Sequence, residues 1–166
     1  MPTKYEEMCT AVLEAEKSKA EYRDHCWKYM ATIFNGFLSD CGIPQNHVTL
    51  LKWNGSNNDE SRFSASDGGA YTFPGAAVLG DDGFWRLGVR IFLEPMATIS
   101  FVFYVGEEGG CPLIRVADRT YKPDLEIADS CNEIYEDVIR RVKDAFSFPK
   151  KAKSTGIGFV VESQRA

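Results

Sequence analysis

Histidine is scarce in this chain of 166 residues, which has only His25 and His47. A zinc site takes three or four converging Cys, His or carboxylate ligands, and spacings such as HExxH and CxxC are absent. We therefore expect no metal site and no cofactor. Cys26 stands beside His25, and a Cys–His couple stays open because such partners meet in space rather than in sequence.

Complete glycine motifs for phosphate binding or serine catalysis are also missing. Neither GxxxxGK[ST] nor GxSxG occurs, and the Gly-x-Gly at 156–158 lacks a third glycine and a following helix. Asp59, Glu60 and Asp67 match the spacing of no calcium loop or glycosidase pair. These absences favour a binding protein, and a small enzyme that uses Cys, His or carboxylates is the least favoured hypothesis.

The chain has no long apolar run. No stretch approaches the roughly 20 apolar residues of a membrane span, and the N-terminal residues lack the apolar core of a signal peptide. The five cysteines are an odd number, whereas a secreted disulfide scaffold favours an even one. The net charge of −5 disfavours nucleic acid and anionic membranes. We expect a cytoplasmic protein with reduced thiols and neither a nucleic-acid nor a membrane partner.

The residues present predict one α+β domain over 1–166, since the length suits one core and 44% of the residues are hydrophobic. The first element is a long helix over 3–41. Thr3 and Glu6 fit a capping box, while Gly42 and Pro44 end the helix. About 38 residues span roughly 57 Å, more than the approximately 40 Å diameter of a compact chain of this size. The first half of the helix should therefore project.

An apolar seam runs along this projecting half at alternating steps of three and four residues, close to a coiled-coil repeat. The second half is apolar on more of its circumference and should be embedded in the domain. The seam would contact a second copy, another protein or, if the helix bends, the chain's own sheet. Its members are Tyr5, Met8, Val12, Ala15, Lys19 and Tyr22.

A mainly antiparallel sheet of five to six strands is predicted over 47–117. Its strands cover 47–53, 70–80, 84–94, 98–106 and 111–117, with turns at 81–83, at 95–97 and around 107–110. Gly83 should take the left-handed position of a three-residue loop. The polar segment 54–69 is longer than most structureless loops, which are usually functional or mobile.

Alternation along these strands separates a core face, which includes Leu79, Leu87 and Phe101, from a face that carries arginines. The arginine face is first interpreted as the solvated side of the sheet. The alternative is a shallow ligand trough, in which small residues lie in one row with a tyrosine and two arginines serve as forked donors. The trough residues are Ala76, Arg86, Gly88, Arg90 and Tyr104.

The chain should end with a helix over 123–146 that packs on the apolar face and a short strand over 156–162. Pro123 suits a first helical turn, and Ile127 and Cys131 begin the apolar stripe of this helix. Between helix and strand, the basic run Lys150, Lys151 and Lys153 is interpreted as solvated.

Three hypotheses for function follow. The leading one is a non-catalytic cytoplasmic interaction protein of the adaptor, specialised chaperone, immunity protein or inhibitor type, which associates with a protein partner or with itself through the helix 3–41. The second is a small-molecule-sensing domain with its ligand in the trough or under the segment 54–69. The third is the small enzyme.

Overall fold

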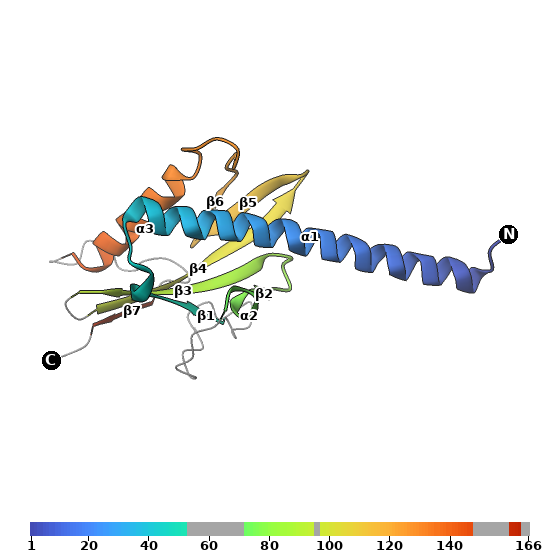
Figure 1. Cartoon of the computed structure of the whole chain (residues 1–166), viewed down its shortest axis with the longest axis horizontal. Coiled ribbons are helices and arrows are strands. Elements are labelled where there is room, and N and C mark those ends of the chain that lie inside the picture. The colour runs from blue at the N-terminus through green and yellow to red at the C-terminus, as the bar shows by residue number, and fades with distance from the viewer. Residues whose placement is uncertain (53–71, 95–96, 148–159, 164–166) are drawn as a thin grey trace.

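The computed structural model describes residues 1–52, 72–94, 97–147 and 160–163 of the chain. The described part has an α+β arrangement in which one long helix precedes an antiparallel sheet, as the sequence predicts (Figure 1). A single 3-10 turn, Gln45–His47, precedes the first strand. The other elements are α1 (Lys4–Cys41), β1 (Val48–Leu51), α2 (Phe73–Ala76), β2 (Val78–Leu79), β3 (Trp85–Leu93), β4 (Ala97–Glu108), β5 (Cys111–Val116), β6 (Arg119–Tyr121), α3 (Asn132–Ala145) and β7 (Val160–Ser163).

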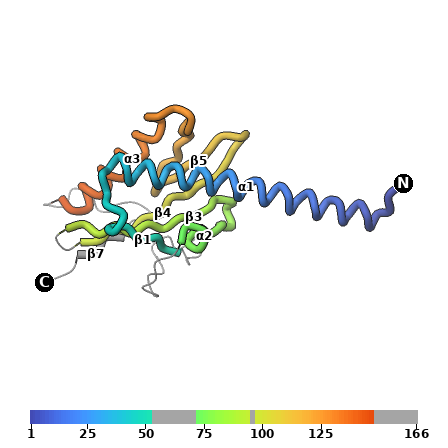
Figure 2. The backbone as a smooth tube through the Cα atoms, viewed as in Figure 1, coloured from blue at the N-terminus to red at the C-terminus, as the bar shows by residue number. Residues whose placement is uncertain are grey.

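The strands of the described residues form one sheet in the order β1-β3-β4-β5-β6. The outer edge of β3 is shared between β1 and β2, and the outer edge of β4 is shared between β5 and β7. All of these pairings are antiparallel. The tube in Figure 2 shows α1 and α3 lying together on one side of this sheet.

Both ends of α1 form as their local sequence predicts. The Thr3 hydroxyl accepts from the Glu6 N–H and the Glu6 carboxylate accepts from the Thr3 N–H, which completes the capping box. At the other end Gly42 takes a left-handed conformation with φ of 65°, and the Ile43 N–H donates to the Leu38 carbonyl. A strong signal at each end therefore fixes the helix over 38 residues.

The main core lies between the sheet and the second half of α1. Met30, Ile33 and Phe37 are buried there, and the Phe37 ring packs edge-on against Phe101 at 5.8 Å and Phe103 at 5.9 Å between centroids. The helix α3 closes the core, and its Tyr135 hydroxyl donates to the Ile33 carbonyl. Aromatic packing of this kind holds one end of α1 rigidly on the sheet.

The segment after Pro123 differs from the predicted helix over 123–146, because α3 begins only at Asn132. The Asp124 carboxylate accepts from the Glu126 N–H, and the Ile127 N–H donates to the Asp124 carbonyl, so the chain forms successive turns instead. Ile127 is consequently exposed rather than part of the apolar stripe. The Asp124 side chain therefore stabilises a turn where the sequence predicts the first turn of a helix.

Buried charged side chains connect α3 to the hairpin of β5 and β6. The strand β6 was not predicted from the sequence. Asp137 accepts from the Tyr121 hydroxyl at 2.7 Å and from Arg141 at 3.2 Å, and Arg141 also reaches Asp118 at 2.6 Å. Burial alone would raise the pKa of Asp137, but the hydrogen bonds from Tyr121, Arg140 and Arg141 outweigh it and lower the pKa below its usual value. The carboxylate therefore stays ionised in the core.

The strand predicted over 70–80 is replaced by a short helix and a two-residue strand in the described residues 72–80. Thr72 is followed by the one-turn helix α2, and only Val78 and Leu79 pair with β3. Leu79 is partly exposed rather than a core residue. The strand predicted at 156–162 appears as β7 over Val160–Ser163, and its first residues, 156–159, lie outside the described part. The segment 54–69 and the lysines at 150, 151 and 153 also lie outside it.

Candidate functional site

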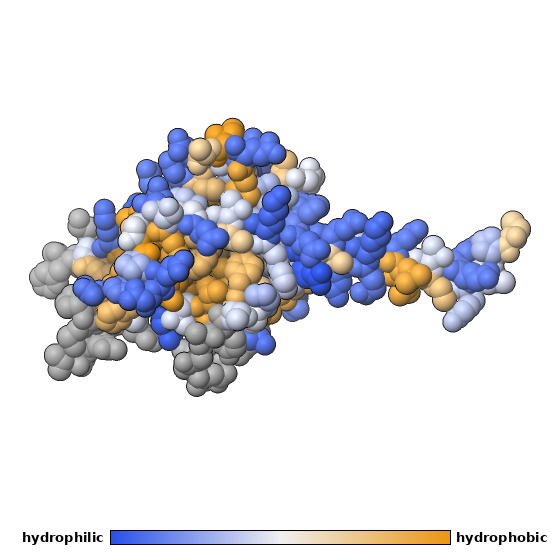
Figure 3. Space-filling view, viewed as in Figure 1, coloured by the Kyte–Doolittle hydropathy of each residue, from blue (hydrophilic) through white to orange (hydrophobic). Residues whose placement is uncertain are grey.

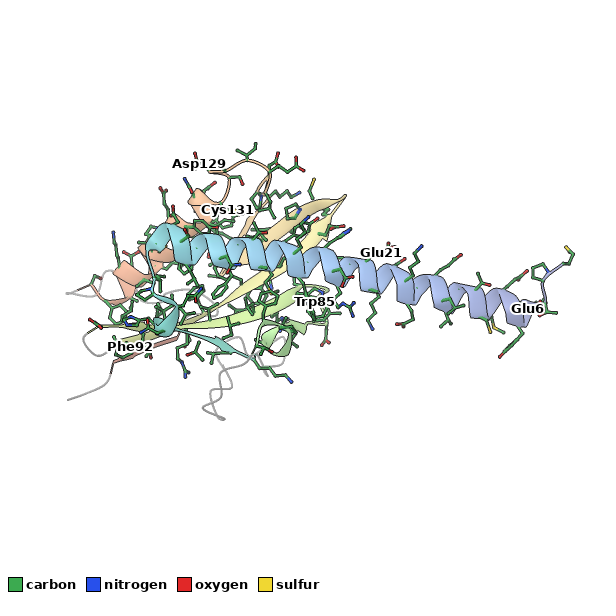
Figure 4. The ribbon with its side chains drawn as sticks, in the orientation of Figure 1. Glu6, Glu21, Trp85, Phe92, Asp129 and Cys131 are labelled. Carbon is green, nitrogen blue, oxygen red and sulfur yellow. The ribbon has the colours of Figure 1, made fainter. Side chains whose placement is uncertain are left out.

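The helix α1 leaves the body of the molecule and runs on well past it toward the N-terminus (Figure 1). Residues 4–19 are exposed, and Ala20 is the first partly buried residue. Figure 4 places Glu6 near the tip of the projection and Glu21 close to the point where the helix reaches the body. The helix is therefore straight enough to project, and it does not fold back on its own sheet.

Three tyrosine and histidine side chains mark the junction. The Tyr22 hydroxyl donates to the Gly83 carbonyl at 2.6 Å, in the turn where Gly83 has the predicted positive φ. The Glu107 carboxylate accepts from the Tyr29 hydroxyl at 2.9 Å and lies 3.0 Å from His25 Nδ1. Tyr22 thus belongs to the docked half of the helix, and the free part of the predicted seam ends before it.

The projecting half carries large apolar side chains that contact no other element of the described structure. Tyr5 and Leu13 are 71% exposed, Val12 is 62% exposed and Met8 is 61% exposed. The space-filling view shows an orange, hydrophobic patch partway along a projection that is mostly hydrophilic (Figure 3). We call Tyr5, Met8, Cys9, Val12 and Leu13 the N-terminal apolar face.

This face is wider than the predicted seam. Along the helix its residues follow the spacing i, i+3, i+4, i+7 and i+8, which spans about 140° of the circumference at 3.6 residues per turn. Cys9 and Leu13 supply the extra width, both on the same side of the seam. The sequence analysis missed them because it followed only the narrower coiled-coil repeat, although their spacing was visible in the sequence.

Charged residues separate the apolar face from the body of the molecule. Ala15 continues the seam, and Lys19 is exposed beyond it, where the exposed pair Lys17 and Glu21 lies 4.0 Å apart. An exposed ion pair of this kind contributes little to stability. The projection is therefore held in place by its own helical hydrogen bonds and by the docked half, with no long-range contact of its own in the described structure.

The predicted ligand trough does not form. Strand β3 ends at Leu93 and β4 begins at Ala97, so the turn starts one residue earlier than expected and Gly88 lies opposite Val102 instead of Tyr104. Ala76 lies in α2 and is buried in the main core. The shift of two residues preserves which side chains share a face, because strand side chains alternate with a period of two.

The face that carries the arginines is not simply solvated either. Arg86 and Tyr104 are 4% and 1% exposed, and the Arg86 guanidinium lies 5.4 Å from the centre of the Tyr104 ring. Arg115 covers the same ring at 4.3 Å and also reaches Asp82 at 3.2 Å. Leu51 occupies the space beside Gly88. The arginines are therefore packed against aromatic rings, which is a structural use of their planar groups.

Asp82 forms ion pairs with both of these arginines, at 3.4 Å from Arg86 and 3.2 Å from Arg115. Burial alone would raise the pKa of Asp82, but the Phe84 N–H that donates to the carboxylate and the neighbouring Arg86 and Arg115 lower it below its usual value. Arg90, which was also predicted to line the trough, donates to the Ser100 hydroxyl on the neighbouring strand at 3.2 Å. These guanidinium groups already have protein partners.

The adjacent His25 and Cys26 do not form a catalytic couple. His25 is directed to Glu107, whereas Cys26 is fully buried in the main core, where burial raises the pKa of its thiol to about 11. A thiol with that pKa is protonated at neutral pH and is a poor nucleophile. The other histidine, His47, packs its ring edge-on against Phe92 and lies 3.9 Å from Glu94.

Two further properties concern the described ranges only. No group of three or more His, Cys, Asp and Glu side chains there is arranged to hold a metal ion. None of the helices in these ranges combines the length and apolar character that crossing a membrane requires. All five cysteines are unpaired, with Cys9 and Cys111 exposed.

No protein-family model, curated protein or solved structure gives a significant match to this chain.

Proposed function

We propose that the protein is a non-catalytic interaction module that binds a protein partner through the N-terminal apolar face of α1. The observation that carries this proposal is the exposure of Tyr5, Met8, Val12 and Leu13 on a helix that extends beyond its own domain. Scattered apolar side chains are ordinary on a protein surface, but a contiguous apolar face on a projecting element is typical of a binding site.

The energetic balance supports a partner of moderate affinity. Full burial of Met8, Val12 and Leu13 would contribute about 1.5–3 kcal/mol each, with the Tyr5 ring in addition. Association costs about 4–15 kcal/mol in lost freedom of motion. The face can therefore offset the lower part of that range by itself, and tighter binding would need contacts that the partner adds.

The stability of the projection points the same way. A free helical segment shorter than about 12–15 residues is marginal in water, and residues 4–19 are only slightly longer than this limit. The docked half nucleates the helix and the capping box closes its far end. A prepared helix that loses little entropy on docking is suited to lie in an apolar groove of a partner.

The charges around the face favour protein over membrane. Glu6, Glu7, Glu14 and Glu16 all lie within the projecting segment, against Lys4, Lys17 and Lys19. Helices that lie on anionic membranes carry mainly lysine and arginine on the polar face. The acidic flanks, together with the net charge of −5, suit a partner that is neutral or basic around its groove. Cytoplasmic location and an adaptor, chaperone, immunity or inhibitor role belong to the same proposal.

Site-specific photo-crosslinking in the cells that naturally produce the protein tests this function. A photoreactive residue replaces Leu13 in one version of the full chain and Glu14, on the opposite side of the helix, in a matched control. We expect protein adducts from position 13 and few from position 14. Equal adduct formation at the two positions, or none at either, would contradict a role for this face in binding.

A further inference from the structure

We infer that oxidation of the Met8 thioether to the sulfoxide weakens binding through the N-terminal apolar face, so that Met8 acts as a redox switch. This inference rests on the proposed function and concerns the regulation of the same site. Met8 is 61% exposed, and Tyr5 and Val12 flank it at i−3 and i+4 along the helix. The sulfur is therefore open to a small oxidant in the free protein and belongs to the surface that a partner would cover.

The methionines of the described ranges differ sharply in accessibility. Met30 is 1% exposed in the main core, whereas Met8 lies on the projecting half, which contacts no other described element. Met1 is also exposed, but it precedes the capping box and lies outside the apolar face. A dilute oxidant would therefore modify the binding face and spare the core, so that binding is lost while the fold is kept.

The apolar face is small, so a change in one side chain has a large effect on binding. Met8 is one of its large exposed side chains, together with Tyr5, Val12 and Leu13. A flexible thioether adapts well to an irregular apolar groove. The sulfoxide is polar, and burial of a polar group without a hydrogen-bond partner is unfavourable. We expect oxidation to weaken binding by about tenfold or more.

Hydrogen peroxide is a sufficient oxidant for this step. The Met8 sulfur attacks one peroxide oxygen with its lone pair, so that an S–O bond forms as the O–O bond breaks. The proton on the transferred oxygen passes to the departing hydroxide, which leaves as water. Sulfur loses two electrons and the peroxide gains them. Methionine sulfoxide reductase restores the thioether, so the change is reversible, as a switch requires.

Peptide mapping by mass spectrometry tests the accessibility of the two sulfur atoms. The purified full chain is treated with hydrogen peroxide and sampled over time. We expect Met8 to be oxidised at least about tenfold faster than Met30, because the core must open before Met30 is exposed. The circular dichroism spectrum should stay helical when Met8 is fully oxidised. Similar rates at the two positions, or loss of the helical spectrum, would overturn the inference.

Photo-crosslinking tests the effect on binding. The full chain carries the photoreactive residue at position 13 and the substitution Cys9→Ala, which leaves Met8 as the one sulfur-containing side chain of the face. The purified chain is oxidised with peroxide, freed of the reagent, mixed with an extract of the producing cells and irradiated. We expect the yield of protein adducts to fall about tenfold and to recover after treatment with methionine sulfoxide reductase.

Two variants assign the effect to one side chain. In Met8→Leu, which has a similar volume and no sulfur, the ratio of adduct yields with and without peroxide should be close to one. Met30→Leu, in the core, should lose adducts on oxidation as its parent chain does. An unchanged yield in the parent chain, or an equal loss in Met8→Leu, would overturn the inference while the proposed function stands. Absence of adducts from the untreated chain would contradict the proposed function itself, and this inference with it.

Discussion

The two halves of α1 have the same helical geometry and a similar apolar repeat, but opposite surroundings. Cys26 and Ile33 are fully buried, whereas Val12, at the same position of the seven-residue repeat nearer the N-terminus, is 62% exposed. The difference arises because the sheet ends near Gly83 and Glu107, and the helix does not. A periodic apolar face therefore identifies which side of a helix binds, and leaves open whether the chain itself supplies the binding surface.

The polar contacts differ in the same way. In the described structure the side-chain hydrogen bonds and the ion pair of the projecting half link residues close in sequence, such as Thr3 with Glu6 and Lys17 with Glu21. In the docked half Tyr22 and Tyr29 reach residues on the sheet. The projecting half can therefore unfold or rearrange locally with little effect on the body, as expected of a segment with few tertiary contacts.

The largest effect should come from a pair of identical substitutions, one in each half. Met30→Ala leaves a cavity in the main core and should lower the free energy of unfolding by about 2–5 kcal/mol. Met8→Ala removes an exposed side chain and should change it by no more than about 0.5 kcal/mol. Urea denaturation followed by circular dichroism at low protein concentration measures both.

Low concentration matters because an associated form would add stability of its own. If Met8→Ala proved as destabilising as Met30→Ala under these conditions, the projecting half would be part of the folding unit of the single chain. The contrast between the halves would then be lost, and with it the argument for a free binding face.

Substitution of a glycine in the docked half should change the free energy of unfolding by less, and the sign of the change shows how closely α3 packs on α1. In an isolated helix Gly→Ala is favourable by about 1 kcal/mol. A Cβ at Gly36 would overlap the Tyr135 hydroxyl, which donates to the Ile33 carbonyl at 3.1 Å. We expect Gly36→Ala to lower the free energy of unfolding by about 1–3 kcal/mol, as overpacked sites do.

The matched control is Ser18→Ala, an exposed position of the projecting half. It should be neutral or slightly stabilising, since alanine has the higher helix propensity. A stabilising Gly36→Ala, measured by the same urea titration, would show that α3 does not hold α1 as closely as the Tyr135 contact indicates.

Local signals explain how much could be predicted from the sequence. Thr3, Glu6 and Gly42 fix the ends of α1 through contacts within a few residues, and strand alternation fixes the faces of β3 and β4. Both kinds of signal are insensitive to the rest of the molecule. The length of α1 against the size of the body was enough to predict that the helix projects.

The incorrect predictions arise mostly where two local backbone structures are almost equally favourable. A turn that starts at Glu94 instead of Pro95 moved Gly88 away from Tyr104 and removed the trough. The Asp124 side chain serves a turn as readily as a helix, so the start of α3 could not be read locally. Burial of Arg86 beside the Tyr104 ring, against which Arg115 also packs, depends on tertiary packing alone. Leu13 is different, because its spacing of i+4 from Cys9 is visible in the sequence. A search for a full apolar helix face, instead of the narrow coiled-coil seam, would have included it.

The smallest effect concerns the tip of the projection and depends on pH. Backbone and side-chain hydrogen bonds from Thr3 lower the pKa of Glu6 below its usual value. Because the pKa is lower in the folded state, the capping contribution is complete above the unfolded value of about 4.3 and is lost as the pH falls through the folded value. We therefore expect the ¹³Cα shifts of residues 4–10 to move toward coil values between pH 6 and pH 3, while those of residues 26–38 stay helical.

Glu6→Gln should weaken this pH dependence, and Glu14→Gln, which is not part of the capping box, should preserve it. If both variants respond to pH as the unmodified chain does, the capping box does not hold the tip, and the free half of α1 is stabilised by its connection to the docked half alone.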